Sequence, residues 1–343
     1  MEKVDQLIQK IDQEEGKEKL GIGKILSYDI LQVHERPYSY IARCTIRGTE
    51  GKKNVYVKVY KPFRLGKPKD YSEKIIREFK TTLFWYQKLK PIEGVGTIRP
   101  LYIFPQEFTI ITEETPGVRF VEMLEEMKYF PFRKKIRRMR QVLMNIGRWL
   151  KVFQEIGEIK SQQFNPGDLI ADVDLRLRRL VDYPGLDFDN DDRHRILSTL
   201  HKLAHQVPSR ELRMCLLHQD FALSNILINQ NEVVLLDFND IEKGSVYFDV
   251  SRFFHQLEML TFQPMYRRRV VRELQKSFLK GYDQPEVAEH AIFRMFLIRH
   301  SITQLIKVAR FQKYPLPQRW INRWYVFKHF QLIQAVSRGK QFF

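Results

Sequence analysis

The sequence predicts an α+β protein with a β-rich N-terminal part and a mainly helical C-terminal part. Strand-like alternation occupies residues 24–60, helical periodicity predominates after residue 118, and Thr115-Pro116-Gly117 interrupts both patterns. At 343 residues the chain is long enough for two substantial lobes, and its 43% hydrophobic content indicates packed cores. We therefore expect an N-terminal helical extension at 1–20, an N-lobe at 21–117 and a C-lobe at 118–343.

The N-terminal elements follow from apolar spacing and from turn residues. A short amphipathic helix is expected within 1–20 from four apolar residues at helical spacing, Val4, Leu7, Ile8 and Ile11. The alternating runs 39–47 and 54–60 flank a Gly-rich turn and predict a β-hairpin. The elements expected next are a loop between Pro62 and Pro68, a helix from its N-cap Ser72 to Lys90, and strands at 97–104 and 108–113.

The C-terminal elements follow from helical periodicity and from one acidic run. The expected elements are helices at 119–128, 134–158, 168–181 and 191–206, strands and loops at 214–240, and helices over 247–343. The acidic run 187–192 lacks the Gly that a calcium-binding loop needs at its sixth position, and Ser198 replaces the Glu at its twelfth. The run therefore predicts a helix N-cap with acidic residues in the first turn. No Cys/His cluster in the sequence suggests zinc.

Two apolar, β-branched runs in the second half of the chain each end in an acidic residue. Asp220 ends the first run, Asn225 follows five residues later, and Asp237 ends the second run. Phosphoryl transfer needs one carboxylate beside the attacking hydroxyl, and an Asn with a second carboxylate to hold Mg²⁺. Two ordinary turn carboxylates at strand ends are the alternative interpretation. With Asn225 at this spacing, the sequence favours phosphoryl-transfer chemistry.

The order of elements and the spacing of these residues resemble the aminoglycoside phosphotransferase and choline kinase-like family, within the protein-kinase-like fold. That family carries His-Gly-Asp, an Asn five residues after the Asp, and a hydrophobic run ending in Asp with Gly seven and Asp twelve residues further on. Those positions are occupied here by His218, Asp220, Asn225, Asp237, Gly244 and Asp249. The organisation matches over about residues 20–300, and the specific motifs lie at 214–255. The resemblance implies a bilobal fold and an ATP-dependent kinase that phosphorylates an alcohol group.

The resemblance gives each motif residue an expected role. Asp220 would orient the acceptor hydroxyl and accept its proton late in transfer, whereas Asn225 and Asp237 would bind Mg²⁺ through hard oxygen ligands. His218 is expected to orient the loop through hydrogen bonds. Asp249 is expected to cap the following helix and to fix the catalytic loop. ATP and Mg²⁺ are the cofactors that this assignment requires.

Lys58 is the expected phosphate-binding lysine, because it lies inside a strand that resembles the corresponding kinase strand. Alternation places Tyr56 and Lys58 on one face of that strand, so Tyr56 is a candidate for stacking on adenine. Lys61 is the competing lysine, at the end of the strand. The acidic partner is expected from the next helix, where Glu78 is favoured over Glu73. Ordinary surface charge is the alternative for both Lys58 and Glu78.

Other nucleotide contacts are less strongly indicated by the sequence. The strand that ends in Glu113 and Glu114 resembles the hinge, whose backbone groups would meet adenine. The family's glycine-rich loop is missing, so phosphate contacts would come from Ser39 and from backbone amides of the turn at 35–39. Gln219 also departs from the Gly or Arg that is usual at its position. These two departures leave a nucleotide-binding pseudokinase as an alternative.

The net charge of +17 is concentrated in two regions. Residues 251–343 contain 17 Lys or Arg and 5 Asp or Glu, and residues 133–140 contain six basic residues. Such regions attract nucleic acid, anionic membranes or acidic substrates, although a solvated, solubilising face is an equal alternative. Because no nucleic-acid-reading module accompanies the basic runs, no specific nucleic-acid partner is expected.

The basic C-terminal region bears on the identity of the acceptor. A cation such as an aminoglycoside or an amino-alcohol would be repelled, so a sugar or an anionic glycoconjugate of lipopolysaccharide or exopolysaccharide type is favoured. A cationic small molecule stays the alternative. This preference resembles the lipopolysaccharide kinase branch of the same fold.

Sequence features also bear on location. The chain has no apolar run of about 18 residues and no secretory signal at its first residues. Cys44 and Cys215 lie in apolar strand-like runs and are expected as buried thiols in a reducing compartment rather than as a disulfide. We therefore expect a cytoplasmic protein with peripheral contact at the inner face of an anionic membrane.

Overall fold

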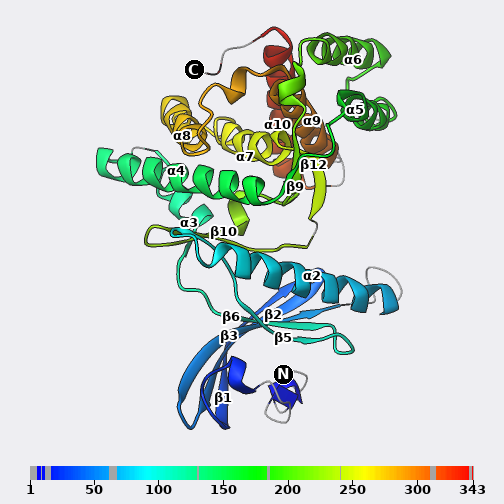
Figure 1. Ribbon diagram of the computed structural model, residues 1–343. Coiled ribbons are helices and arrows are strands. Elements are labelled where there is room, and N and C mark those ends of the chain that lie inside the picture. The colour runs from blue at the N-terminus through cyan, green and yellow to red at the C-terminus, as the bar shows by residue number, and fades with distance from the viewer. Residues whose placement is uncertain are drawn as a thin grey trace. The chain divides into compact units, whose positions relative to one another are not determined.

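A computed structural model of the chain describes residues 6–8, 10–11, 17–61, 68–129, 131–183, 186–239, 241–309, 314–339 and 342 (Figure 1). The chain divides into two compact units. The first is drawn from Met1–Val118 and Leu227–Asp240, and the second from Arg119–Ile226 and Ile241–Phe343. The segment that carries Asp237 therefore belongs to the same unit as the N-terminal strands.

A five-stranded sheet forms the frame of the first unit, in the order β1-β2-β3-β6-β5. Its β2–β3 hairpin is the one that the sequence predicts, with Ile41 opposite Lys58 in the antiparallel register. Alternation decides the faces, since Val55 and Val57 are buried whereas Lys58 is only partly buried. The strands are β1 (Ile25–Arg36), β2 (Ser39–Gly48), β3 (Gly51–Tyr60), β5 (Pro100–Phe104) and β6 (Thr109–Glu113).

The apolar core beneath this sheet includes the chain's first described residues. Residues 6–8, 10 and 11 are helical, and Leu7, Ile8 and Ile11 are buried in one cluster with side chains of β2 and β3. A short 3₁₀ helix, η1 (Lys17–Lys19), follows. The rest of the predicted helix at 1–20, including Val4, lies outside the described residues, as does most of the predicted loop between Pro62 and Pro68.

Helix α2 (Pro68–Leu89) begins earlier than the sequence predicts. Ser72 is not its N-cap, because Ser72 lies inside the helix and its hydroxyl donates to the carbonyl of Pro105 at 3.1 Å. Proline is favoured in the first turn of a helix, where its missing N–H has no intrahelical partner to lose. Pro68, which the sequence analysis places at the end of a loop, is therefore the first residue of the helix.

A small second sheet completes the first unit, in the order β4-β11-β10-β7. The single strand predicted at 97–104 is wrong, because it is two strands in two different sheets. The first of them pairs in parallel with β11, which runs from Glu232 to Leu235 and leads directly to Asp237. The strands of this sheet are β4 (Val95–Thr97), β7 (Val118–Arg119), β10 (Ile226–Asn229) and β11 (Glu232–Leu235).

The second unit is mainly helical (Figure 1). Its helices are α3 (Phe120–Glu125), α4 (Arg133–Ile156), α5 (Pro166–Val181), α6 (Asn190–Ala204), α7 (Tyr247–Leu260), α8 (Arg268–Gly281), α9 (Ala291–Val308) and α10 (Leu316–Ser337). Among the described residues of this unit, short 3₁₀ helices occur at η3 (Ser209–Glu211), η4 (Leu223–Asn225) and η5 (Val287–Glu289). A three-stranded sheet carries the motif region in the order β12-β9-β8, formed by β8 (Glu158–Ile159), β9 (Met214–Leu217) and β12 (Glu242–Ser245).

Glycines allow two of these helices to touch. A Cβ atom at Gly147 of α4 would lie 2.1 Å from the carbonyl oxygen of Phe278, and one at Gly281 of α8 would lie 1.9 Å from that of Met144. No side chain fits at these distances, so the two backbones approach each other only because both positions are glycine.

Several local predictions agree with the structure. Asp189 is the N-cap of α6, and its carboxylate accepts a hydrogen bond from the backbone of Asp192 at 2.8 Å in a capping box. Cys44 and Cys215 are both buried free thiols. In the part of the chain that the structure describes, no helix is long and apolar enough to cross a bilayer.

Candidate active site

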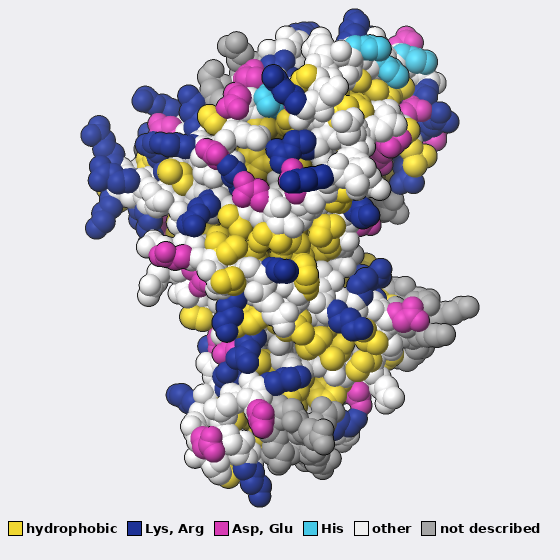
Figure 2. Space-filling view, viewed as in Figure 1, with side chains coloured by type: hydrophobic (Ala, Val, Ile, Leu, Met, Phe, Trp, Pro, Cys, Tyr) yellow, Lys and Arg dark blue, Asp and Glu magenta, His cyan; other side chains and the backbone are white. Residues whose placement is uncertain are grey.

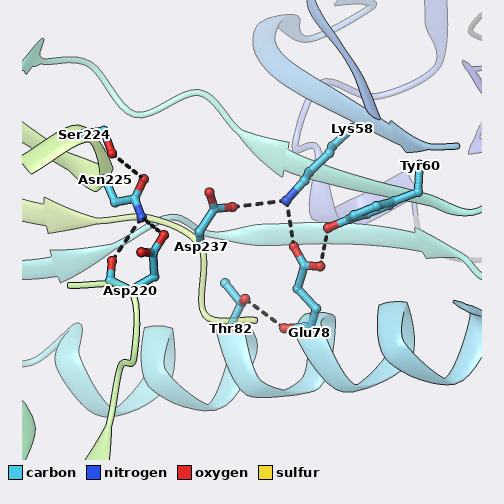
Figure 3. A network of polar contacts seen from close by, with 8 residues as sticks. All are labelled: Lys58, Tyr60, Glu78, Thr82, Asp220, Ser224, Asn225 and Asp237. Atoms are coloured by element: carbon cyan, nitrogen blue, oxygen red, sulfur yellow. Dashed lines mark hydrogen bonds and ion pairs between the residues drawn. The ribbon is translucent and has the colours of Figure 1, made fainter. Parts of the chain in front are cut away.

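Lys58 of β3 forms the centre of a charged network in the first unit (Figure 3). Its ammonium lies 3.1 Å from Glu78 of α2 and 3.1 Å from Asp237, which follows β11. The three residues come from segments far apart in the sequence, and 179 positions separate Lys58 from Asp237. The pairing of Lys58 with Glu78 is the arrangement that the sequence analysis favours.

The neighbours of Lys58 keep it cationic. Burial by itself lowers the pKa of Lys58, but the negative charges of Glu78 and Asp237 oppose this effect and raise the pKa well above its ordinary value. Lys58 therefore carries a full positive charge throughout the neutral range. A fixed cation beside an exposed carboxylate is suited to holding phosphate oxygens.

Glu78 has two further partners that the sequence analysis did not identify. The Tyr60 hydroxyl donates to its carboxylate, and the amide nitrogen of Asn239, with its side chain oriented to face the carboxylate, lies 2.7 Å from both Glu78 oxygens. Burial raises the pKa of Tyr60, so the phenol keeps its proton and acts as a donor. Glu78 is therefore held by three donors, and its side chain is only 8% exposed.

The competing residues, Lys61 and Glu73, have other surroundings. Lys61 pairs with Glu35 at 2.5 Å and lies over the ring of Tyr40, 4.2 Å from its centroid. Glu73 is exposed on the outer side of α2. Within the described part of the first unit, Lys58 is thus the lysine that contacts both Glu78 and Asp237.

The other predicted nucleotide contacts stay predictions, and the structure gives their positions. Tyr56 is partly buried on β3, two residues before Lys58, and Ser39 is buried at the start of β2 opposite Tyr60. The backbone N–H of Glu113 donates to Arg99 at 2.9 Å, and that of Glu114 donates to Asn54 at 3.0 Å. Neither of these two N–H groups is left to meet adenine, so any adenine contact at this point would use carbonyl oxygens or later residues.

Asp220 and Asn225 meet in the second unit (Figure 3). The side-chain nitrogen of Asn225 donates to the carboxylate of Asp220 at 2.7 Å and to its backbone carbonyl at 3.0 Å. The amide of Asn225 is therefore oriented, and its oxygen faces away from Asp220 toward the hydroxyl of Ser224 at 3.3 Å. Arg252 lies 2.6 Å from the other oxygen of Asp220. The side chain of Asp220 is still 52% exposed, so a substrate group has access to it.

One face of α7 holds the loop that carries Asp220. Asp249, Arg252 and Gln256 are spaced by three and four residues, so they lie on one side of this helix. Asp249 accepts from the backbone N–H of His218 at 2.7 Å, and Gln256 accepts from that of Leu223 at 3.1 Å. With Arg252 on Asp220, α7 therefore fixes the loop at three points.

The predicted role of Asp249 needs a correction. Helix α7 begins at Tyr247 without a side-chain cap, so Asp249 does not cap it. Its carboxylate reaches back to the loop instead, and burial raises its pKa to about 7, although backbone hydrogen bonds from His218 and Gln219 oppose the increase. The part of the prediction that places Asp249 on the catalytic loop agrees with the geometry.

We expect Asp249→Asn to remove a pH-dependent part of the protein's stability. The folded state holds Asp249 with a pKa raised above its ordinary value of 3.8, so its stabilising contribution is present below about pH 4 and is lost as the pH rises through about 7. The melting temperature of the wild type should therefore fall relative to that of Asp249→Asn between pH 5 and pH 8. Thermal melts across this range measure it, and a constant difference between the two proteins would contradict it.

Gln219 has a strained backbone that explains why glycine is common at this position of the motif. Its φ is +64°, in the left-handed region that glycine adopts without penalty and that other residues rarely occupy. The side chain of Gln219 is anchored, since its nitrogen donates to Glu242 at 2.9 Å. The departure from glycine therefore adds strain to the backbone at this position of the loop.

Gly244 packs closely against the Leu217 side chain in the motif sheet. It lies in β12 opposite Cys215 of β9, and a Cβ atom there would come within 2.5 Å of the Leu217 side chain. His218, which follows β9, is fully buried with its ring edge-on to Phe153, at a centroid distance of 6.3 Å. Gly244 and His218 thus pack at the strand β9, which leads into the loop that carries Asp220.

The fold and the sequence together define the class of this protein. The chain has the α+β protein-kinase-like fold, with a β-rich N-terminal unit and a helical C-terminal unit, as predicted. Similar solved structures include APH(2'')-IIa in a ternary complex with streptomycin and ATP, at 16% identity and a TM-score of 0.52, covering 94% of this chain and 96% of that one. The amicoumacin kinase hAmiN has 14% identity and a TM-score of 0.54, covering 98% and 94%. Choline kinase from Cryptosporidium parvum Iowa II has 12% identity and a TM-score of 0.52, covering 91% of each chain.

A model of a protein family also matches part of the chain. Residues 137–290 match the phosphotransferase enzyme family. The matched segment is just under half of the chain and contains the motif residues from His218 to Asp249, in agreement with the resemblance that these motifs indicate. At these identities the solved structures support the fold alone. No curated protein sequence matches the chain.

Proposed function

We propose that this protein transfers the γ-phosphoryl group of ATP, with Mg²⁺, to a hydroxyl group of a non-protein acceptor. The observation that carries the proposal is the position of Lys58, 3.1 Å from both Glu78 and Asp237. Phosphotransferases of this fold need a lysine oriented by a glutamate, beside a carboxylate for the metal. A similar structure that contains ATP supports the choice of nucleotide.

The residues proposed to hold Mg²⁺ suit a hard cation. Asp237 offers a carboxylate whose side chain is 40% exposed. Asn225 offers an amide oxygen, because its nitrogen is engaged by Asp220. Carboxylate and amide oxygens are ligands that Mg²⁺ accepts, and the bound ion would neutralise phosphate charge.

The remaining residues act on the phosphates and on the acceptor. Lys58 supplies a fixed positive charge for phosphate oxygens, and its hydrogen bond to Glu78 holds the ammonium group in place. Asp220, held by Asn225 and Arg252, would accept a hydrogen bond from the acceptor hydroxyl and orient its lone pair toward the phosphorus. Its carboxylate would take the hydroxyl proton late in the transfer.

We propose a sugar or an anionic glycoconjugate as the acceptor. Residues 251–343 carry 17 basic and 5 acidic side chains, and a field of this sign attracts anions and repels cations. Lys and Arg also gather at the start of α4, where residues 133–140 lie (Figure 2). A cationic amino-alcohol or aminoglycoside is the alternative, because similar structures are choline kinase and APH(2'')-IIa.

A transfer screen tests both parts of the proposal. The protein is incubated with radiolabelled ATP and Mg²⁺ and with panels of neutral sugars, anionic glycolipids, amino-alcohols and aminoglycosides. We expect transfer to a sugar or a glycolipid, and none by Asp220→Asn. Preferred transfer to a cation would overturn the acceptor assignment alone. If wild type and Asp220→Asn both bind ATP and are equally inert on every panel, the protein is a pseudokinase.

We expect Arg252→Gln to lower kcat about tenfold while leaving the KM for ATP unchanged. Arg252 holds one oxygen of Asp220, and loss of a hydrogen bond between charged groups is worth about 1.5–3 kcal/mol in a buried setting and less where Asp220 is exposed. The acceptor hydroxyl would then be less well oriented, whereas the nucleotide contacts would be unaffected. Steady-state kinetics with each substrate varied in turn separates the two effects.

A matched control and a conservative variant distinguish positioning from a general loss of stability. Arg178 forms an ion pair with Asp174 at 2.8 Å on the surface of α5, so Arg178→Gln removes a similar pair far from any motif residue in the sequence. It should leave kcat unchanged. Arg252→Lys keeps the charge and should restore part of the activity. Equal losses of kcat in Arg252→Gln and Arg178→Gln would argue against positioning.

A further inference from the structure

Helix α10 buries one side and exposes apolar side chains on the other. Its buried residues, Asn322, His329, Leu332, Ile333 and Val336, lie on one face, and α10 packs there against α9. A surface helix normally places polar residues opposite its buried face. On α10 the outer face instead carries four large apolar residues spaced by four, four and three positions, Leu316, Trp320, Trp324 and Phe327.

These four side chains are strongly exposed. The exposed fractions are 68% for Leu316, 70% for Trp320, 45% for Trp324 and 51% for Phe327. We call this set the outer stripe of α10. Single exposed apolar residues are ordinary, but a row of them along a helix indicates a surface that contacts something apolar.

Basic side chains border the outer stripe on both sides. Arg323 lies 6.0 Å from the ring centroid of Trp320, and Lys328 lies 4.4 Å from that of Trp324. Arg319 is one helical turn before Arg323 on the same side. Arg323 and Lys328 thus each lie beside an aromatic ring, an arrangement in which long basic side chains reach from an apolar layer into a polar one.

The chain segment that carries the stripe has charges of one sign. Residues 291–343 contain ten Lys or Arg and no Asp or Glu. A second copy of this chain would bring the same acid-free segment against itself, and like charges at an interface oppose association. An anionic surface is complementary to it.

We propose that the outer stripe of α10 lies on the surface of an anionic lipid bilayer. Trp and Phe would occupy the interfacial layer, Leu316 would reach the acyl boundary, and Arg319, Arg323 and Lys328 would meet lipid phosphates. The helix is not apolar enough to cross a bilayer, so it would lie parallel to the surface. This proposal is independent of the catalytic proposal, because it concerns residues outside the motifs.

The four tryptophans of the chain provide a direct measurement. Trp85 and Trp149 are 1% and 0% exposed, so acrylamide quenches chiefly the emission of Trp320 and Trp324. The full-length protein is titrated with phosphatidylcholine vesicles with and without phosphatidylglycerol. We expect anionic vesicles to shift the emission to the blue and to protect it from acrylamide. Neutral vesicles should have little effect, and added salt should reverse the response.

A double variant and a matched control locate the contact. Leu316→Ser with Trp320→Ser removes the two most exposed residues of the stripe, and vesicle affinity measured by co-sedimentation should fall about tenfold or more. Leu26 on β1 is 65% exposed, so Leu26→Ser removes a comparable side chain elsewhere and should leave affinity unchanged. Circular dichroism and thermal melts verify that both variants are folded.

Three outcomes would overturn the proposal. One is the absence of any vesicle response, and another is equal binding to neutral and anionic vesicles. The third is a concentration-dependent oligomer that the double variant abolishes in sedimentation velocity, which would assign the stripe to contact with a second copy. Vesicle binding in the absence of ATP and acceptor, whether or not the protein transfers phosphate, would support the proposal and separate it from the catalytic one.

Discussion

Asp220→Asn is expected to lower kcat about 10²–10⁴-fold and to leave ATP binding unchanged. The amide has the shape of the carboxylate and keeps an oxygen for Asn225, but it does not accept the proton of the acceptor hydroxyl. Asp220 is also 52% exposed, so the substitution disturbs little packing. Single-turnover transfer and calorimetric titration with ATP measure the two quantities separately.

Asp29 provides a closely matched control for this substitution. Asp29 forms an ion pair with Arg47 at 2.6 Å and is 50% exposed, whereas Asp220 pairs with Arg252 at 2.6 Å and is 52% exposed. Asp29→Asn therefore removes a similar charge from a similar setting on β1, and it should keep full activity. Retention of full activity by Asp220→Asn, on an acceptor that the wild type phosphorylates, would disprove the role assigned to this residue.

Asp237→Asn is expected to remove the dependence of nucleotide binding on Mg²⁺ and to lower kcat/KM about 10²-fold or more. The neutral amide is a weaker ligand for a divalent cation and no longer balances the charge of Lys58, which lies 3.1 Å away. The backbone should tolerate the change, because the φ of Asp237 is +61° and asparagine adopts this conformation more readily than most residues. ATP titrations with and without Mg²⁺ measure the effect.

Asp283 provides the matched control for Asp237. It too has a positive φ, +62°, and its carboxylate pairs with a lysine, Lys151. Asp283→Asn therefore repeats the backbone setting and the lost lysine contact without touching a motif residue. We expect it to bind ATP and Mg²⁺ as the wild type does. If Asp237→Asn kept the tighter binding of ATP in the presence of Mg²⁺, the metal would have to be held elsewhere.

Local pattern was sufficient for most elements and for the motif residues. The β2–β3 hairpin, the helices of the second unit and the capping box at Asp189 all follow from short-range spacing and turn chemistry. The spacing from His218 to Asp249 indicated the family resemblance without information on any tertiary contact. Two of the wrong predictions, Ser72 as an N-cap and a single strand at 97–104, lie where a proline or a change of sheet decides an element's end.

The partners of the site residues were harder to predict. Arg252 and Gln256 hold the catalytic loop from α7, and the only signal for them is their helical spacing from Asp249. Tyr60 and Asn239 bind Glu78 from β3 and from the segment after β11. The sequence does not distinguish these polar residues from ordinary surface residues, because their hydrogen-bond partners lie far away along the chain.

The sequence alone indicated the family resemblance, the order of the elements and the roles proposed for Asp220, Asn225, Asp237 and Lys58. These depend on residue type and on short spacing, which the covalent chain preserves. The tertiary structure brought Lys58 into contact with Glu78 and Asp237, placed Asp249 on the loop instead of at the helix end, and exposed the aromatic side of α10. Each of these choices depends on the packing of distant segments, such as the strand and the loop that bring Lys58 and Asp237 together across 179 positions.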